Sequence, residues 1–277
     1  MISSQNYGNI LFRHKKGICK MGKFDGFLIC SDLDGTFRNK DDMKPNIDAV
    51  KYFTDNGGIF TFATGRSVPH LEKLDYNFLM NAPACVCNGG AVYDFKNKAL
   101  LYERHLDFTI TDFFNNIKKY TGNLNNVYIY NNCFESEYSY NTSKILSEKI
   151  RLENVIKLIC VFESVDDADK FKEYAKEQQL FKNCYIGKSW SVGVEFNSVN
   201  ATKGKAIEFL KNHLKNIHTT IGIGDYENDI PLLKCADVGV AVGDALDCVK
   251  DVADFVVKPH NQSSVCDLIN LMDKELK

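Results

Sequence analysis

Residues 27–36 have the sequence FLICSDLDGT, in which an apolar run leads directly into two acids and a glycine. A short apolar run that ends in turn-forming residues predicts a buried strand followed by a turn. Because side chains two residues apart on a strand point the same way, we expect Asp32 and Asp34 to face one site. Acids at a strand end can equally be turn formers, so this stretch alone leaves both interpretations open.

A magnesium ion would explain why two acids stand so close together. Neighbouring carboxylates repel each other, and one of them tends to keep a proton unless a cation lies between them. Mg²⁺ takes oxygen ligands and is usually bound through one or two carboxylates, phosphate and water. Asp225, which follows an expected strand at 219–224, supplies a further carboxylate from another part of the chain. These acids therefore predict a Mg²⁺ site.

Strand and helix signals alternate on both sides of a less regular middle segment. Before residue 92 the pattern predicts helices at 45–56 and from Ser67, with strands at 59–63 and 84–87. After residue 188 it predicts strands at 191–196, 219–224, 238–242 and 254–257, and helices at 203–214, 227–234 and from Ser263 or Ser264. Such alternation indicates a parallel sheet covered by helices on both faces.

The middle segment carries aromatic and asparagine-rich stretches and predicts a separate α+β unit. Strands are expected there at 127–130, 155–162 and 184–186, and helices at 111–120, 143–152 and 166–179. The predicted fold class is therefore α/β, a doubly wound, Rossmann-like parallel sheet interrupted by an inserted α+β domain. The predicted divisions are an N-terminal extension at 1–23, a core at 24–92 and 188–277, and the inserted domain at 93–187.

Composition excludes several classes of protein. The 277 residues are 44% hydrophobic and 25% charged, with a formal net charge of −2, which is ordinary for a globular protein and gives no footprint for nucleic acid. No apolar stretch approaches the roughly 20 residues of a membrane helix, and residues 1–23 lack the apolar segment of a secretion signal. Ten scattered cysteines favour buried, reduced thiols and hence the cytoplasm.

Further polar residues follow the expected strands, at the sheet edge where ligands of open α/β folds bind. Thr64 and Gly65 follow the strand at 59–63, Lys203 opens a helix, and residues 224–229 have the sequence GDYEND. A hydroxyl, a lysine and several carboxylates suit the charge that a transferring phosphoryl group develops. No zinc-binding histidine pair, serine-hydrolase elbow or nucleotide-binding loop offers a competing site.

Four motifs now stand in a specific order: DLDGT at 32–36, ATGR at 63–66, KG at 203–204 and GDYEND at 224–229. This order resembles that of the haloacid dehalogenase-like hydrolases, and the resemblance extends from about residue 25 to the end of the chain. The large insertion between the second and third motifs, with Asn-Gly at 88–89 before it, resembles the Cof-type sugar-phosphate phosphatases, whose α/β cap lies at that position.

The resemblance implies a role for each acid. Asp32 corresponds to the nucleophile that attacks phosphorus and becomes an aspartyl phosphate. Asp34 corresponds to the general acid/base, which protonates the leaving oxygen and later deprotonates water. The implied Mg²⁺ ligands are the Asp32 carboxylate, the Asp34 backbone carbonyl and Asp225, with Asp229 as a further acidic ligand or support.

The resemblance also implies which residues hold the phosphate. Thr64, Gly65 and Lys203 correspond to the family's phosphate-binding groups, and Asn228 is expected to donate to the phosphate or to a neighbouring acid. Arg66 could contact substrate or form a surface ion pair. Lys188 and Lys205 are expected to be solvated surface lysines. Five aromatic residues could line a substrate-facing surface of the cap, although packing in a core or domain interface is favoured for them: Tyr128, Tyr130, Phe134, Tyr138 and Tyr140.

The function predicted from the sequence is Mg²⁺-dependent hydrolysis of the phosphate monoesters of small metabolites, most often sugar phosphates, through an aspartyl phosphate on Asp32. A small phosphorylated metabolite is the only expected partner, with no nucleic acid or membrane. Two alternatives stay open: a phosphotransferase of the phosphomutase type, and a non-catalytic protein that binds a phosphorylated metabolite on the same scaffold.

Overall fold

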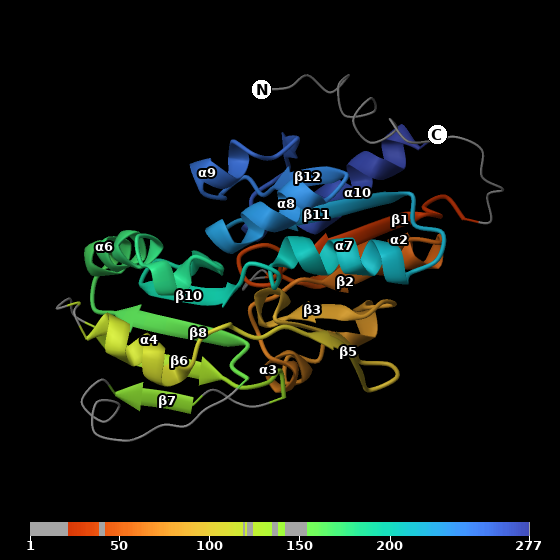
Figure 1. Ribbon diagram of the computed structural model, residues 1–277. Helices are drawn as coiled ribbons and strands as arrows, with labels where there is room; N and C mark the ends of the chain where they lie inside the picture. The colour runs from red at the N-terminus through yellow and green to blue at the C-terminus, as the bar shows by residue number, and fades with distance from the viewer. Residues whose placement is uncertain are drawn as a thin grey trace.

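The computed structural model describes residues 22–38, 42–118, 120, 124–134, 138–141 and 154–276. Its central sheet is built from β1 (Phe27–Ser31), β2 (Ile59–Phe62), β11 (Thr219–Gly224), β12 (Val238–Ala241) and β13 (Phe255–Val256). All are parallel, in the order β13-β12-β11-β1-β2 (Figure 1). Every residue of β1, β11 and β12 is buried, as expected for strands covered on both faces.

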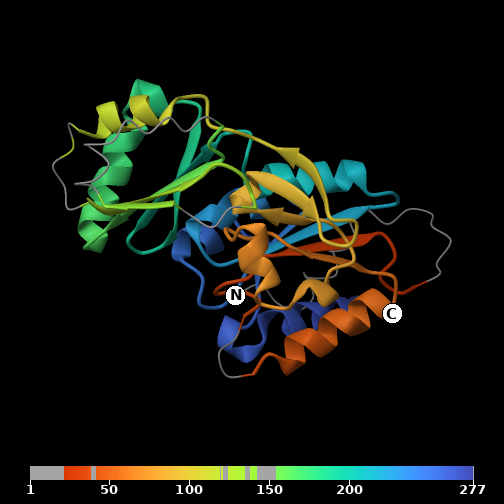
Figure 2. The same cartoon turned by 90° about the horizontal axis from the view of Figure 1, so that it is seen from below.

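Helices cover both faces of this sheet (Figure 2). On one face α2 (Lys44–Asp55) packs against α10 (Ser264–Glu275), and on the other α7 (Lys203–His213) packs against α8 (Ile230–Cys235). A short helix, α9 (Asp247–Lys250), follows β12. The buried apolar residues of α10 recur at helical spacing, which explains how this helix attaches to the core: Val265, Leu268, Ile269 and Met272.

The strand order places a ligand site between β1 and β11. From β1 the chain continues to β2 on one side, whereas from β11 it continues to β12 on the other. Ligands of open α/β sheets bind outside the carboxyl ends of the strands where the order reverses in this way. Asp32 and Asp225 are the residues that directly follow these two strands. The predicted doubly wound α/β core is confirmed.

A second, antiparallel sheet forms with its own helices and apolar core. Its strands are β6 (Leu124–Tyr130), β7 (Tyr138–Asn141), β8 (Lys157–Phe162), β9 (Cys184–Trp190) and β10 (Gly193–Ser198), in the order β7-β6-β8-β10-β9. Its helices are α4 (Ile110–Ile117) and α6 (Val165–Lys176). Phe113, Phe171 and Phe196 are at the centre of a cluster separate from the main core. We call this unit, from Leu106 to Ser198, the cap.

A third sheet connects core and cap. It is antiparallel and consists of β3 (Ala84–Val86), β4 (Ala91–Asp94) and β5 (Ala99–Glu103). The strand predicted at 84–87 was expected in the parallel sheet, but β3 meets β2 only through a bridge between Ala63 and Cys85. The short helix α3 (Val68–Glu72) lies between β2 and β3, and single 3₁₀ turns span Asn77–Leu79, Cys87–Gly89, Gln179–Phe181, Glu227–Asp229 and His260–Gln262.

One more expectation about a strand was wrong. The strand expected in the core at 191–196 is β10, which pairs with β8 and β9 in the cap sheet. The expected boundary between residues 187 and 188 therefore falls inside β9, and the division of the chain into domains stays a prediction. The expected helix at 143–152 lies outside the described residues. Among the residues that the structure describes, no helix has the length and apolar character needed to cross a membrane.

Candidate active site

Asp32 directly follows β1 and is nearly buried, with 6% of its surface exposed. Its backbone N–H donates to the Ile223 carbonyl of β11 at 2.9 Å. This bond adds one hydrogen bond to those between β1 and β11 and fixes the position of the Asp32 backbone. One carboxylate oxygen, Oδ1, accepts a hydrogen bond from Lys203 Nζ at 2.5 Å. No described residue donates to the other oxygen, Oδ2, so it is available to a substrate.

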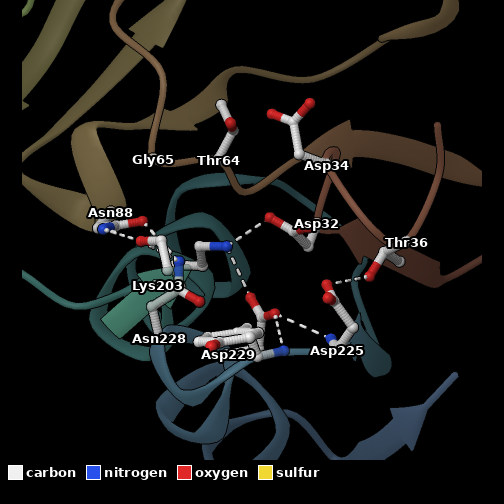
Figure 3. A network of polar contacts seen from close by, with 12 residues as sticks. Asp32, Asp34, Thr36, Thr64, Gly65, Asn88, Lys203, Asp225, Asn228 and Asp229 are labelled. Carbon is white, nitrogen blue, oxygen red and sulfur yellow. Dashed lines mark hydrogen bonds and ion pairs between the residues drawn. The ribbon is translucent and has the colours of Figure 1, made fainter. Parts of the chain in front are cut away.

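Lys203 begins α7, where the hydroxyl of Thr202 caps the helix by accepting from a backbone N–H. The lysine side chain is fully buried and its ammonium bridges Asp32, at 2.5 Å, and Asp229 Oδ1, at 2.6 Å (Figure 3). Burial alone would lower the pKa of Lys203, but the charges of Asp229 and Asp32 outweigh burial and raise that pKa above its usual value. Lys203 is therefore a permanent cation in the site.

Asp229 holds the loop after β11 in place. Its Oδ2 accepts the backbone N–H groups of Asp225 and Tyr226 at 2.9 and 3.1 Å. Both of its oxygens are thus engaged, which makes Asp229 a support for the neighbouring acids. Asp225 is oriented in turn by Thr36, whose hydroxyl donates to Asp225 Oδ1 at 2.9 Å.

The acids at this sheet edge fit a divalent cation. Ligand oxygens of Asp32, Asp225 and Asp229 all lie within 4.8 Å of one another, with one lysine to balance them. Burial raises the pKa of Asp225 to about 7, helped by the charge of Asp229. Burial likewise raises the pKa of Asp32, and Asp229 and Asp225 add to this against the opposing charge of Lys203. A cation with a preference for oxygen ligands would relieve this excess of negative charge.

Asp34 does not face this cluster, contrary to expectation. Figure 3 shows its carboxylate turned away from Asp32, and both of its oxygens are held by arginines. Arg66 donates to Oδ2 at 2.6 Å and to Oδ1 at 2.9 Å, and Arg38 donates to Oδ1 at 2.7 Å. Burial would raise the pKa of Asp34, but the arginines outweigh it and lower that pKa. The strand has ended at Ser31, so the strand spacing that predicted a shared direction no longer applies.

For Arg66 the sequence left two possibilities, contact with substrate or a surface ion pair. Arg66 is part of an ion pair, but its partner is Asp34 in the site. Thr64, in the same turn, is buried, and its Oγ1 accepts the Arg66 backbone N–H at 3.1 Å, which leaves the hydroxyl proton free to donate. A Cβ on Gly65 would lie 3.0 Å from Asn88 Oδ1, so this turn is built for a glycine.

A cavity of about 520 Å³ lies between core and cap and opens onto these residues. From the core it is lined by Asp32, Asp34, Thr64, Gly65, Arg66, His70, Asp225, Tyr226 and Asn228. From the cap it is lined by Tyr128, Tyr130, Lys157, Ile159, Ser189, Trp190 and Glu195. The predicted nucleophile, general acid/base, threonine and metal ligand are thus brought together at one end of a cavity whose opposite wall is the cap.

A polar network under the cap was missed from the sequence. Asn88 Oδ1 accepts from Asn228 Nδ2 at 3.1 Å, and Asn88 Nδ2 donates to Glu195 Oε2. Asn228 Nδ2 also donates to Ser189 Oγ at 3.1 Å. The amide of Asn228 thus donates to Asn88 and Ser189, and its expected contact with phosphate stays a prediction. The Asn-Gly at 88–89 was the only sequence signal for this network, because the cap residues come from distant strands.

Other expectations had mixed outcomes. Lys188 was expected at the surface but is buried and pairs with Asp169 at 2.6 Å, whereas Lys205 is exposed as expected. The aromatics divide: Tyr128 and Tyr130 line the cavity as well as packing against the core, and Phe134 is 45% exposed. The side chains of Tyr138 and Tyr140 lie outside the described residues. The cysteines of the described part of the chain are free, and most are buried.

Comparison with known proteins places this site in a family. Residues 29–269 match the family model of the haloacid dehalogenase-like hydrolases. The 5-amino-6-(5-phospho-D-ribitylamino)uracil phosphatase YcsE of Bacillus subtilis is 24% identical and covers 87% of this chain and 94% of its own length. Pyridoxal phosphate phosphatase YbhA of Escherichia coli is 23% identical, covering 87% of this chain and 97% of its own.

Solved structures agree on the fold. A haloacid dehalogenase-like hydrolase from B. subtilis superposes with a TM-score of 0.72 at 18% identity, over 88% of this chain and 98% of its own. A sugar phosphatase of HAD subclass IIB superposes with a TM-score of 0.69 at 19% identity, over 88% of this chain and 97% of its own. This chain belongs to the haloacid dehalogenase-like hydrolases, as a phosphatase of the Cof type.

Proposed function

We propose that this protein hydrolyses phosphate monoesters of small metabolites, sugar phosphates above all, with Mg²⁺ and through an aspartyl phosphate on Asp32. One observation carries the proposal. Asp32 keeps one oxygen free at the end of a large cavity while the buried ammonium of Lys203 holds its other oxygen at 2.5 Å. A carboxylate that is held in a fixed direction, beside a cation and with one oxygen uncovered, is suited to attack phosphorus.

In the first half of the reaction, Asp32 Oδ2 attacks phosphorus and the bond between phosphorus and the ester oxygen breaks. The Thr64 hydroxyl and the Gly65 N–H donate to the phosphoryl oxygens, and Lys203 balances their charge. Asp34 gives its proton to the departing alcohol oxygen. In the second half, Asp34 takes a proton from water, whose oxygen attacks phosphorus and restores the Asp32 carboxylate.

Asp34 must move for this role. It lines the cavity, but Arg66 and Arg38 hold its carboxylate and favour the ionised form. We infer that the side chain turns about its Cα–Cβ bond toward the ester oxygen once substrate is bound. A side-chain rotation of this kind takes far less time than a typical turnover, so it need not limit the rate.

The carboxylates of Asp32 and Asp225 and the backbone carbonyl of Asp34 would hold Mg²⁺, with Asp229 behind them. A magnesium ion supplies positive charge where the phosphoryl oxygens gather negative charge. The cluster fits such an ion because its donors are all oxygens and its charge is poorly balanced without one. Buried free thiols such as Cys30 and Cys85 support a reducing compartment, and we place the protein in the cytoplasm.

Replacing Asp32 by asparagine tests the proposal. Asparagine keeps the shape of the side chain, so the fold should persist by circular dichroism while turnover of p-nitrophenyl phosphate with Mg²⁺ falls by about four orders of magnitude or more. Asp48→Asn, at an exposed position of α2, is the control and should retain turnover. Undiminished turnover in Asp32→Asn would overturn the assignment of the nucleophile.

The two alternatives differ from the proposal in their products. A phosphomutase would return an isomeric phosphate ester, whereas a phosphatase releases inorganic phosphate, so a phosphate assay with mass spectrometry of the organic product separates them. A binding protein would bind a phosphorylated metabolite without releasing phosphate from any ester. The intact set of Asp32, Lys203 and Asp225 supports turnover.

A further inference from the structure

We propose that Lys157 and Glu195 of the cap form a subsite for a vicinal diol in the alcohol part of the substrate. This inference rests on the proposed phosphatase function and names its substrate class as phosphate esters of polyols and sugars. The proposal rests on two buried residues that line the cavity side by side. Lys157 has an N–H donor without an acceptor, and Glu195 has an oxygen without a donor, among the described residues.

The two residues come from neighbouring strands of the cap sheet. β8 and β10 are antiparallel, with Glu195 opposite Ile159, and Lys157 lies two residues before Ile159 on the same face. This face is directed at the core, since all three side chains line the cavity. The position of the pair is thus set by strand register, which makes it rigid.

The hydrogen bonds of the pair are incomplete. Lys157 Nζ donates to the Gly65 carbonyl at 3.0 Å and lies 3.0 Å from Glu195 Oε1. Apart from the Gly65 carbonyl, Lys157 Nζ has no directed hydrogen-bond acceptor among the residues that the structure describes. Glu195 Oε2 accepts from Asn88, whereas the buried Oε1 accepts no directed hydrogen bond from any described residue. Buried polar groups are normally satisfied, so this donor and this acceptor call for a ligand.

A hydroxyl group matches the unused N–H of Lys157 and the unused Oε1 of Glu195, because a hydroxyl both accepts and donates hydrogen bonds. Two adjacent hydroxyls would satisfy both atoms at once, one accepting from Lys157 and the other donating to Glu195. A buried ion pair gains little stability over apolar residues of the same volume, so its presence in the cavity wall is better explained by binding than by folding.

The location of the pair specifies which hydroxyls are bound. Lys157 holds the carbonyl of Gly65, whose neighbour Thr64 is a proposed phosphate ligand. The recognised diol therefore lies on carbons close to the ester carbon. Tyr128, Tyr130 and Trp190 supply flat apolar walls for the rest of the molecule.

A second anion on the substrate is disfavoured by the same geometry. Glu195 already balances the charge of Lys157 at 3.0 Å, so a carboxylate or second phosphate would meet a neutral pair and a nearby negative oxygen. Neutral hydroxyls meet no such repulsion. The subsite thus selects polyol and sugar phosphates over small phosphorylated acids.

The test compares two esters that differ only in the diol. Glycerol 3-phosphate carries adjacent hydroxyls, propyl phosphate carries none, and p-nitrophenyl phosphate reports the chemistry of the core. The wild-type protein with Mg²⁺ should show a kcat/KM for glycerol 3-phosphate roughly 10- to 100-fold above that for propyl phosphate, since hydrogen bonds to charged groups are worth this much.

The double variant Lys157→Met with Glu195→Gln removes the pair without leaving a lone buried charge. Its kcat/KM ratio for the two esters should fall to about one, and circular dichroism shows that the variant is folded. Loss of the Lys157 bond to the Gly65 carbonyl acts on both esters alike, so it does not change their ratio. Lys188→Met is the matched control, because Lys188 is a buried, ion-paired lysine of the cap that does not line the cavity. It should leave the ratio unchanged.

Failure of the diol subsite and failure of the phosphatase function give different results. A wild-type ratio near one, or an unchanged ratio in the double variant, would overturn the diol subsite while the phosphatase function stands. No release of phosphate from any ester, p-nitrophenyl phosphate included, would overturn the phosphatase function and the subsite with it.

Discussion

Lys203 determines the charge balance of the site. Among the residues that the structure describes, it is the one cation in contact with both Asp32 and Asp229, and no part of it reaches solvent. Removing one partner of a buried ion pair leaves the others uncompensated, which is far more damaging than losing a pair at the surface. The motif Lys-Gly predicted this residue, but its double contact and its complete burial are visible only in the fold.

We predict that Lys203→Met lowers the free energy of unfolding by about 3–5 kcal/mol and abolishes turnover. Urea unfolding followed by tryptophan fluorescence measures the loss. Lys205→Met is the matched control on the same helix, where an exposed pair with Glu208 should be worth less than about 1 kcal/mol. Equal effects of the two substitutions would contradict the role given to Lys203.

The raised pKa of Asp225 predicts a pH dependence. Its value changes from 3.8 in an unfolded chain to about 7 in the folded protein without metal, so the folded state holds this proton more tightly. The resulting stability is complete below about pH 4 and is lost as the pH rises through 7. Mg²⁺ must displace the proton, so its affinity should rise up to about tenfold per pH unit and level off above about pH 7.

Thermal unfolding with and without Mg²⁺ at several pH values measures both effects. The metal-free protein should melt at a lower temperature at pH 8 than at pH 6, and Mg²⁺ should raise the melting temperature more at pH 8. A Mg²⁺ effect that is the same at both pH values would show that Asp225 is already ionised in the metal-free protein.

At the scale of elements, the core strands and the loops that follow them were predictable. A short apolar run such as 27–30, bounded by turn-forming residues, favours a buried strand, and the acids that follow it are then expected at the sheet edge. The sequence could not show which sheet a strand joins. The sequence of β10 favours a strand as clearly as that of β12 in the core. Its place in the cap sheet is seen only from its pairing with β8 and β9.

The expected helix at 227–234 shows a second limit. Its first turn is instead a 3₁₀ turn, because Asp229 uses its side chain to accept backbone N–H groups of its own loop. Such local side-chain hydrogen bonds compete with helix formation, and here they serve the site. The chemistry of the loop therefore overrides the helical pattern.

Gly35, in the loop after β1, lies against Asp225, one of the proposed Mg²⁺ ligands. Its φ is +86°, and a Cβ would lie 2.5 Å from Asp225 Oδ2. We expect Gly35→Ala to lower stability by about 1–2 kcal/mol from the left-handed backbone alone, and to weaken Mg²⁺ binding by displacing Asp225. Isothermal titration with Mg²⁺ measures the second effect, and unchanged affinity would mean that Asp225 adjusts freely.

For the whole molecule, the contacts between cap and core matter most. Lys172 of α6 pairs with Glu227 of the last motif at 2.9 Å, and the Tyr185 hydroxyl donates to the Glu227 carbonyl at 2.7 Å. Glu227 stands at a position that the motif leaves variable, so this contact could not be predicted from the motif. The cap thus holds the same loop that carries Asp229.

We predict that Lys172→Met raises KM for a metabolite substrate about two- to fivefold, because a partly buried ion pair that seats the cap is lost. Turnover of p-nitrophenyl phosphate, whose binding requires little of the cap, should change less. Lys176→Met is the matched control, since Lys176 pairs with Glu173 on the exposed side of the same helix. A larger effect from Lys176 would argue against a seating role for Lys172.

The pairing of β1 with β11 has a consequence for the synthesis of the protein on the ribosome. It brings together Asp32 and Asp225, which are 193 positions apart in the 277-residue chain, with the cap between them. Contacts so distant in sequence form late, and during translation Asp32 and the cap are made before Lys203 and Asp225. A nascent chain that ends before Lys203 therefore contains Asp32 without the lysine and the acids that surround it in the folded protein. Turnover is expected only after the segments on both sides of the cap have been made and have paired.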